Sequence, residues 1–360
     1  MTEDVKTMAE RKPLDLKRLL ADILLWCALF AFTAFSAANA AALKQYPQVS
    51  LRYETPVSGQ AAYRARQYAI EHREEPTFWP TFWIENTARF SVEFREVTAD
   101  CITYSGEAAL VWITEYIAGG APGVTDGTGC AISAGLAWEL WGDIDVIGKT
   151  VEVDGAPRIV RGVLDGVEPL ALLSVRDEDK TQSFTAVELS GGPESPSRSD
   201  AVGFATAAGL GTPYSVLMGS PAVLAELIAL LPLAILIIYG LALCINKLKR
   251  RSAVLRRILI FSLCLGAALL LPGFLDLLPD WLIPTRWSDF SFWGGLFGQI
   301  GENLREYLAL YPSLRDVGYK TLFFKQIGLV SIAAGLALSI CFRRHGKRRF
   351  EMLKRRIDCG

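Results

Sequence analysis

The stretch GCAISAGLAWELWGDIDVIGKTVEVDGAPRIVRGVL, residues 129–164, decides the fold of the domain that contains it. Its apolar run at residues 130–132 predicts a short buried strand. Ser133 predicts a helix N-cap, because its hydroxyl can accept a hydrogen bond from a free N–H of the first turn. Gly142 predicts the end of that helix, because glycine readily adopts the left-handed conformation that follows a helix.

The remainder of the stretch has the pattern of a helix face and a hairpin. An apolar helical face is predicted by four residues at 3.6-residue spacing: Leu136, Ala137, Leu140 and Trp141. Val151 and Val153 then alternate with polar residues, Asp154-Gly155 is a hairpin turn signal, and residues 159–164 form the returning strand. The predicted unit is strand, short helix, hairpin.

This order of residues resembles the extracytoplasmic core domain of MacB-like and FtsX-like ABC transporter permeases. In that family a strand ending Ile-Ser leads into a helix Leu-Ala-x-x-Leu-(Phe/Trp)-Gly. A turn Asp-x-(Val/Ile)-Gly-Lys and a strand-turn-strand ending Val-x-Gly-Val follow. The corresponding segments here are residues 132–133, 136–142, 145–149 and 160–163. The resemblance is specific for that module.

One segment inside the stretch imitates a phosphate-binding loop. Residues 142–150 end in Gly-Lys-Thr, but five residues separate the glycines and a strand is predicted to follow. A Walker A loop has four residues between its glycines and a helix after them, which receives the phosphate. The sequence therefore predicts no nucleotide site here, and no cofactor.

Four long apolar runs predict transmembrane helices. They are residues 19–42, 222–245, 258–275 and 322–342, and each has roughly the 20 residues that cross a bilayer as a helix. These runs account for a hydrophobic content of 51%. The first run has a second interpretation as a cleaved signal peptide, because Lys17-Arg18 precedes it and Ala38-Asn39-Ala40 resembles a cleavage site. Its length favours a retained span.

Basic residues predict the orientation of the spans. The link at residues 246–257 carries only basic charges and the tail at residues 343–360 is strongly basic, which places both, and residues 1–18, in the cytoplasm. Residues 43–221 then lie outside, with 13 Lys and Arg against 24 Asp and Glu, a net charge of −11. Basic patches beside membrane spans indicate topology and contact with lipid headgroups, and no nucleic-acid partner is expected.

The sequence thus predicts a membrane protein with an α+β extracytoplasmic domain inserted between the first and second of four helices. Residues 276–321 form a second outside segment. Its apolar positions from Phe292 to Leu308 follow helical spacing, so this helix is expected either on the membrane surface or packed under the domain. Pro312 suits the start of the last long helix.

Candidate reactive residues are few. The two histidines, His72 and His345, are not placed to serve a nucleophile, and no Cys/His pattern has metal-ligand spacing, so no catalytic or metal-binding residue is predicted. Of the seven cysteines, Cys101 and Cys130 are the two predicted to lie outside, where oxidation is permitted. A disulfide between them and two separate thiols both remain open.

One span, a large outside domain and three further spans is the arrangement of the MacB-like family. The resemblance implies a permease subunit without enzymatic activity, in the cell membrane, driven by a separate cytoplasmic ABC ATPase and paired with a second permease chain, either a copy or a paralogue. The basic link offers Arg250, Arg251, Arg256 and Arg257 for docking of the ATPase.

The chain departs from the family in two places. Its link lacks the usual Gly-rich coupling segment, and the outside segment before the fourth run is long. The alternative function is a membrane-anchored sensor or scaffold whose outside domain binds a peptide, a lipid or a cell-envelope partner.

Overall fold

The computed structural model describes residues 16–44, 49–113, 115–176, 179–193, 196–248, 290–310 and 313–357, with parts of 254–269. The chain divides into two compact units. The helical unit is Met1–Ala41, Ala225–Leu265 and Phe324–Gly360, and the sheet domain is Ala42–Leu224 with Gly266–Phe323.

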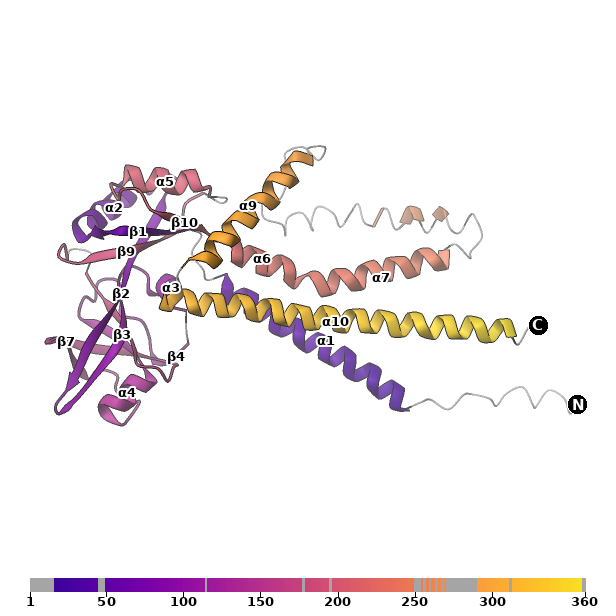
Figure 1. Ribbon diagram of the computed structural model, residues 1–360, viewed down its shortest axis with the longest axis horizontal. Helices are drawn as coiled ribbons and strands as arrows, with labels where there is room; N and C mark the ends of the chain where they lie inside the picture. Colours follow the sequence, from indigo (N-terminus) through magenta and orange to yellow (C-terminus); the bar gives the residue numbers. More distant parts are fainter. Residues whose placement is uncertain are drawn as a thin grey trace, which may run out of the picture. The chain divides into compact units, whose positions relative to one another are not determined.

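The described strands of the sheet domain form one mixed ten-stranded sheet in the order β10-β1-β9-β2-β3-β8-β5-β7-β4, with β6 paired to β2 and β7 (Figure 1). The pairs β3–β8 and β5–β7 are parallel and the others antiparallel. The strands are β1 (Val49–Ser58), β2 (Phe78–Val92), β3 (Arg95–Ser105), β4 (Tyr116–Gly119), β5 (Gly129–Ser133), β6 (Thr150–Val153), β7 (Ala156–Leu164), β8 (Leu170–Ser174), β9 (Ser183–Gly191) and β10 (Ser215–Met218).

Helices cover both faces of this sheet. On one face, α2 (Gly59–Glu71) and α5 (Arg198–Ala207) pack over the β10-β1-β9 end, and α4 (Ala134–Trp141) packs over the β3-β8-β5 region. The other face carries a third cluster with α3 (Ala108–Val111). Because side chains alternate along a strand, neighbours such as Phe82 and Trp83 are both buried, in different clusters.

The organising stretch folds as predicted. Ser133 caps α4 by accepting a hydrogen bond from the Leu136 N–H at 3.1 Å, and Gly142 ends the helix in the left-handed conformation with φ 69°. Asp154 and Gly155 have φ values of 49° and 83°, as a two-residue hairpin turn between β6 and β7 requires. The Gly-Lys-Thr segment leads into β6 and not into a helix.

Other parts of the domain extend the sheet. Strands β2 and β3 form one long hairpin, whose turn is formed by Glu93 and Phe94. The aromatic cluster at residues 78–83 belongs to β2, where three of its rings are buried and Trp79 is half exposed. The segment before the second apolar run forms β10 at the sheet edge.

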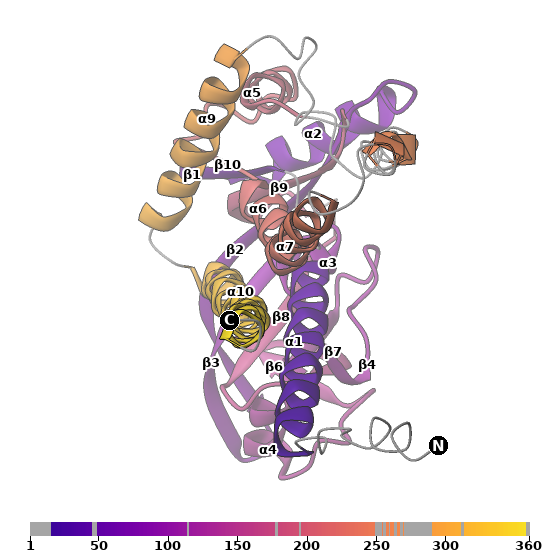
Figure 2. The same ribbon diagram turned by 90° about the vertical axis from the view of Figure 1, so that its right-hand side faces the viewer.

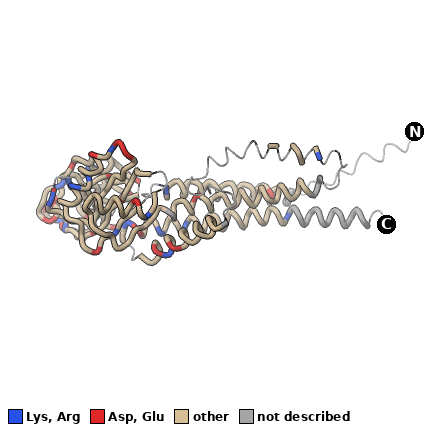
Figure 3. Tube along the Cα trace, turned by 90° about the horizontal axis from the view of Figure 1, so that it is seen from above, with Lys and Arg blue, Asp and Glu red and all other residues tan. Residues whose placement is uncertain are grey.

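Three described helices are long and apolar enough to cross a membrane: residues Leu19–Leu43, Pro221–Ile245 and Leu314–Arg343. They belong to α1 (Leu16–Leu43), to α6 (Ser220–Ala229) with α7 (Leu231–Leu248), and to α10 (Leu314–Ile357). Lys, Arg, Asp and Glu are frequent on the sheet domain and sparse along the three apolar spans (Figure 3). The predicted span at residues 258–275 lies mostly outside the described residues, so the count of four remains a prediction.

Within the helical unit, small residues let the helices approach. Leu29 of α1 is buried against Ala333, Ala337 and Ile340 of α10, and the pair of alanines four residues apart is a common interface pattern between membrane helices. Gln326 of α10 donates hydrogen bonds to Ser36 Oγ at 3.0 Å and to the Ala225 carbonyl at 3.1 Å, and accepts one from Asn39 at 3.1 Å. One amide therefore links α1, α6 and α10.

The cap of α4 makes a stability prediction. The Ser133 hydroxyl donates to the Glu168 carbonyl and accepts from the N–H groups of Leu136 and Leu170, all in a buried site. We expect Ser133→Ala to lower the free energy of unfolding by about 2–3 kcal/mol, because it leaves buried polar groups without partners. The matched control is Ser197→Ala, which removes the exposed cap of α5 and should cost about 1 kcal/mol.

Unfolding of the full chain in one detergent, followed by circular dichroism, measures both losses. Equal losses for Ser133→Ala and Ser197→Ala would contradict this account.

Candidate functional site

A row of polar side chains lies on the sheet face opposite α2 and α5. Along β1, Val49, Leu51 and Tyr53 face the core under those helices, so Ser50 and Arg52 point to the other side. Glu188 of β9 is paired with Ser50 in the sheet register and lies beside it. Burying a row of charged side chains on a sheet costs free energy of folding unless another element supplies hydrogen-bond or ion-pair partners.

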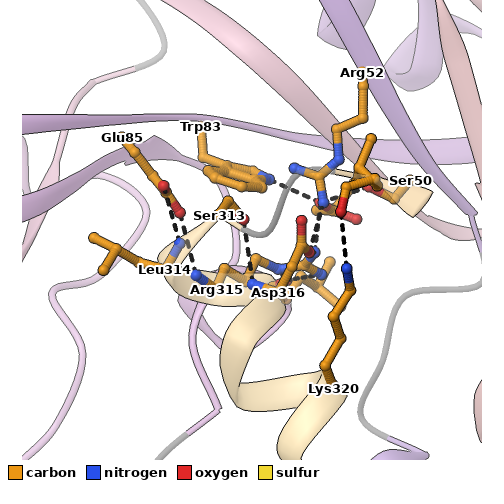
Figure 4. A network of polar contacts seen from close by, with 12 residues as sticks. Ser50, Arg52, Trp83, Glu85, Ser313, Leu314, Arg315, Asp316 and Lys320 are labelled. Atoms are coloured by element: carbon orange, nitrogen blue, oxygen red, sulfur yellow. Dashed lines mark hydrogen bonds and ion pairs between the residues drawn. The ribbon is translucent and has the colours of Figure 1, made fainter. Parts of the chain in front are cut away.

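The first turn of α10 supplies those partners (Figure 4). The Glu85 carboxylate of β2 accepts hydrogen bonds from the N–H groups of Leu314 and Arg315, at 3.0 and 3.1 Å. Ser313 Oγ accepts from the Asp316 N–H at 3.2 Å. The free N–H groups of the helix start are thus satisfied, and a carboxylate is favourable at the positive end of the helix dipole.

Four charged side chains form the centre of this contact, and we call them the clamp: Arg52, Glu188, Arg315 and Asp316. Arg315 Nη1 lies 3.0 Å from Glu188 Oε1 and 3.4 Å from Asp316 Oδ1. Arg52 Nη2 lies 2.9 Å from Asp316 Oδ1 and 3.7 Å from Glu188 Oε1. None of the four is more than 5% exposed, and their charges balance.

Neighbouring groups complete the clamp. Glu188 Oε1 also accepts hydrogen bonds from Trp83 Nε1 at 2.8 Å and Ser50 Oγ at 2.9 Å. Arg315 donates from Nε and Nη2 to the Leu110 carbonyl, at 3.2 and 2.9 Å. The Arg52 guanidinium lies 4.6 Å from the Trp83 ring centroid. These contacts offset part of the cost of burying four charges, which water would otherwise solvate.

Because of the clamp, the described long apolar helices are all connected to β1 or to a strand that pairs with it. α1 precedes β1 in the sequence, and α6 follows β10, which pairs with β1 through Val49 and Met218. α10 begins at the clamp, where Asp316 is bonded to Arg52 of the same strand. A displacement of any of these helix ends would act on this one strand and its neighbours.

Comparisons with known proteins gave matches among solved structures. No protein-family profile and no curated protein matches the chain. Among solved structures, it is similar to the extracellular domain of the noncanonic ABC-type transporter YknZ from Gram-positive bacteria, with 13% identity, a TM-score of 0.38, and coverage of 48% of this chain and 98% of that one.

Two further solved domains are similar to part of the chain. The periplasmic region of MacB from Actinobacillus actinomycetemcomitans has 9% identity and a TM-score of 0.38, covering 48% of this chain and 87% of that chain. A domain assigned to a permease protein of Porphyromonas gingivalis has 16% identity and a TM-score of 0.32, covering 44% and 81%.

In the structure, Cys101 and Cys130 are both buried free thiols. Cys101 on β3 is paired with Ala171 of β8, and β8 lies between β3 and β5, which carries Cys130. Two strand spacings of about 4.8 Å each exceed the Cα–Cα reach of a disulfide. Of the two alternatives that the sequence left open, this strand order favours the separate thiols.

The structure describes one of the four predicted docking arginines. Arg250, Arg251 and Arg256 lie outside the described residues, and Arg257 is exposed. No group of three His, Cys, Asp or Glu side chains that could hold a metal ion occurs among the described residues.

Sequence reasoning missed the clamp, although two signals for it were present. Ser313 is followed three residues later by Asp316, which is a capping pattern just before an apolar helix. Glu188 stands inside a strand whose flanking residues are apolar. The pairing of Arg52 with Asp316 joins residues 264 positions apart. No local sequence pattern specifies such a pair.

A double-mutant cycle tests the clamp. We expect Arg315→Met and Glu188→Gln each to lower the free energy of unfolding by about 3–5 kcal/mol, because each leaves a buried charge without its partner. The double variant should lose less than the sum of the two, by at least about 1 kcal/mol.

The control is Arg198→Met, which removes the partly exposed ion pair with Glu306 and should cost at most about 1 kcal/mol. Denaturant unfolding of the full chain in detergent measures all four variants. Strict additivity of Arg315→Met and Glu188→Gln would show that the two side chains do not interact.

Thiol chemistry tests the cysteine geometry. Burial raises the pKa of Cys101 and of Cys130 to about 12, so both remain protonated at neutral pH and are poor nucleophiles. We expect neither to react with an alkylating reagent in the folded chain, and both to react after denaturation without reductant. Mass spectrometry of the peptides measures this, and a bridged peptide pair would restore the disulfide.

Proposed function

We propose that this chain is the permease-like membrane subunit of an ABC transporter of the mechanotransmission type. A separate cytoplasmic ATPase would move the membrane helices, and the helices would move the sheet domain outside. The observation that carries the proposal is the convergence on β1, where β10 pairs with it and the start of α10 is bonded to Arg52. A sheet domain attached in this way follows its helices.

Two further observations support a permease. Residues 129–164 fold as the strand, capped helix and hairpin whose sequence resembles the MacB-like module. Three described helices have the length and composition of membrane spans. We propose four spans in all, with the domain of residues 43–221 between the first and second.

The proposed orientation follows from charge. The basic residues of 246–257 and 343–360 face the cytoplasm, and the acidic sheet domain lies on the opposite side of the cell membrane. A second permease chain, either a copy or a paralogue, would complete the transporter.

The ATPase is proposed to dock on the basic link between the second and third spans. Arg250, Arg251, Arg256 and Arg257 lie there, and charge pairs with an acidic surface raise association rate and specificity. The link also joins two spans directly, so force applied to it reaches both helices.

Charge reversal tests this docking. We expect the double variant Arg250→Glu, Arg251→Glu to insert normally and to lose copurification of the ATPase, while Arg256 and Arg257 keep the topology. The matched control reverses Arg355 and Arg356 in the tail, which should leave copurification unchanged. Topology is read from single cysteines placed at Ser252, expected to be protected from an impermeant reagent in intact cells, and at Ser197, expected to react.

A correctly inserted double variant that still binds an active ATPase would remove the link from the docking site. Absence of any ATPase from the wild-type chain, purified with its membrane partners, would favour the sensor or scaffold function.

A further inference from the structure

Helix α9 (Phe290–Ala309) presents three different faces. Leu296 and Tyr307 are buried on the side that meets the sheet domain. Polar side chains that include Glu302 and Arg305 are exposed on another side. Between these two lies an apolar stripe at spacings of four, seven and four residues: Trp293, Phe297, Leu304 and Leu308. Phe297 is 67% exposed and Leu308 is 44% exposed.

Contacts at its C-terminal half hold α9 in this orientation. Glu306 is paired with Arg198 of α5, and the helix lies beside β10 at the sheet edge (Figure 2). Lys320 of α10 donates hydrogen bonds to the carbonyls of Leu308 and Leu310, at 3.4 and 2.8 Å, and lies over the Tyr307 ring. These contacts fix the rotation of α9 about its own axis, so the stripe is held facing outward.

We propose that the stripe of Trp293, Phe297, Leu304 and Leu308 lies in the lipid–water interface of the outer membrane leaflet. Lys320, which binds the C-terminal end of α9, stands two residues before the apolar run at residues 322–342. Two residues of helix correspond to about 3 Å. The C-terminal end of α9 is thus at the level where α10 enters its apolar run.

The N-terminal half of α9 has the composition of an interfacial segment. The segment Phe290–Gly301 has no charged residue. Trp293 stacks edge-on with Phe292 at 5.5 Å and lies 6.5 Å from Phe297. Tryptophan and neighbouring aromatic rings favour the interfacial depth of a bilayer.

A lipid partner fits this stripe better than a second protein chain does. Four partly exposed side chains on one helix offer on the order of 300 Å², well below the roughly 800 Å² per partner of a stable protein interface. A bilayer has no such minimum area, because the attached domain and spans already keep the helix at its surface. The inference depends on α10 crossing the membrane and is independent of the ATPase.

Site-directed spin labelling of the full chain in phosphatidylethanolamine–phosphatidylglycerol vesicles tests the proposal. The five cysteines outside the sheet domain core (Cys27, Cys244, Cys264, Cys341 and Cys359) are replaced by serine, while Cys101 and Cys130 stay as buried thiols. A nitroxide is attached through Phe297→Cys, and, as the matched control on the polar face of the same helix, through Glu302→Cys. Circular dichroism and gel filtration confirm that each labelled chain is folded.

We expect the nitroxide at position 297 to relax more with oxygen than with a water-soluble nickel chelate, and the one at position 302 to show the reverse. The ratio of the two accessibilities should differ several-fold between the positions. Equal, high nickel accessibility at both positions would place the stripe in water and overturn the proposal. Dipolar broadening of the nitroxide spectrum at position 297, with low accessibility to both reagents, would assign the stripe to a contact with a second copy of the chain. That result would overturn the proposal as well.

Discussion

The carboxylate of Glu188 is the group on which the attachment of α10 depends. It has no contact with water, and one of its oxygens meets Arg315, Trp83 and Ser50 within 3.0 Å. A buried charge of this kind is stable only if its counter-ions arrive in a defined geometry. Because Arg315 comes from a helix remote in sequence, the sheet domain can satisfy its own polar face only when α10 is in place.

Such an ion cluster contributes less to stability than to specificity. Replacing four buried charges by apolar side chains of similar volume is often neutral or stabilising, so stability alone does not account for them. Apolar surfaces tolerate sliding, whereas the clamp fixes α10 in position and rotation on β1 and β9. The hydrogen-bonded amide of Gln326 has the corresponding role among α1, α6 and α10 in the helical unit. Polar contacts thus hold α10 in two places, at the clamp in the sheet domain and at Gln326 in the helical unit.

Local parts of the fold could be predicted from sequence, and long-range pairings could not. The cap at Ser133, the left-handed Gly142 and the turn at Asp154-Gly155 depend on residues within a few positions of each other. The strand order depends on pairings such as β3 with β8, which separates Cys101 from Cys130 and for which the sequence offers no local signal. The clamp was not predicted for the same reason, since the local signals at Asp316 and Glu188 do not specify which residues pair with them.

The continuity of α10 has a consequence for how this chain can change in evolution. The helix runs for 44 residues without interruption, and it carries the clamp residues near its start and Gln326 ten residues after Asp316. Insertion of one residue between them would rotate one contact set against the other by about 100°. A change in the number of residues between them therefore changes the phase of the two contact sets along the helix, whereas a substitution at an exposed position does not. The length of this segment is therefore under tighter constraint than its composition.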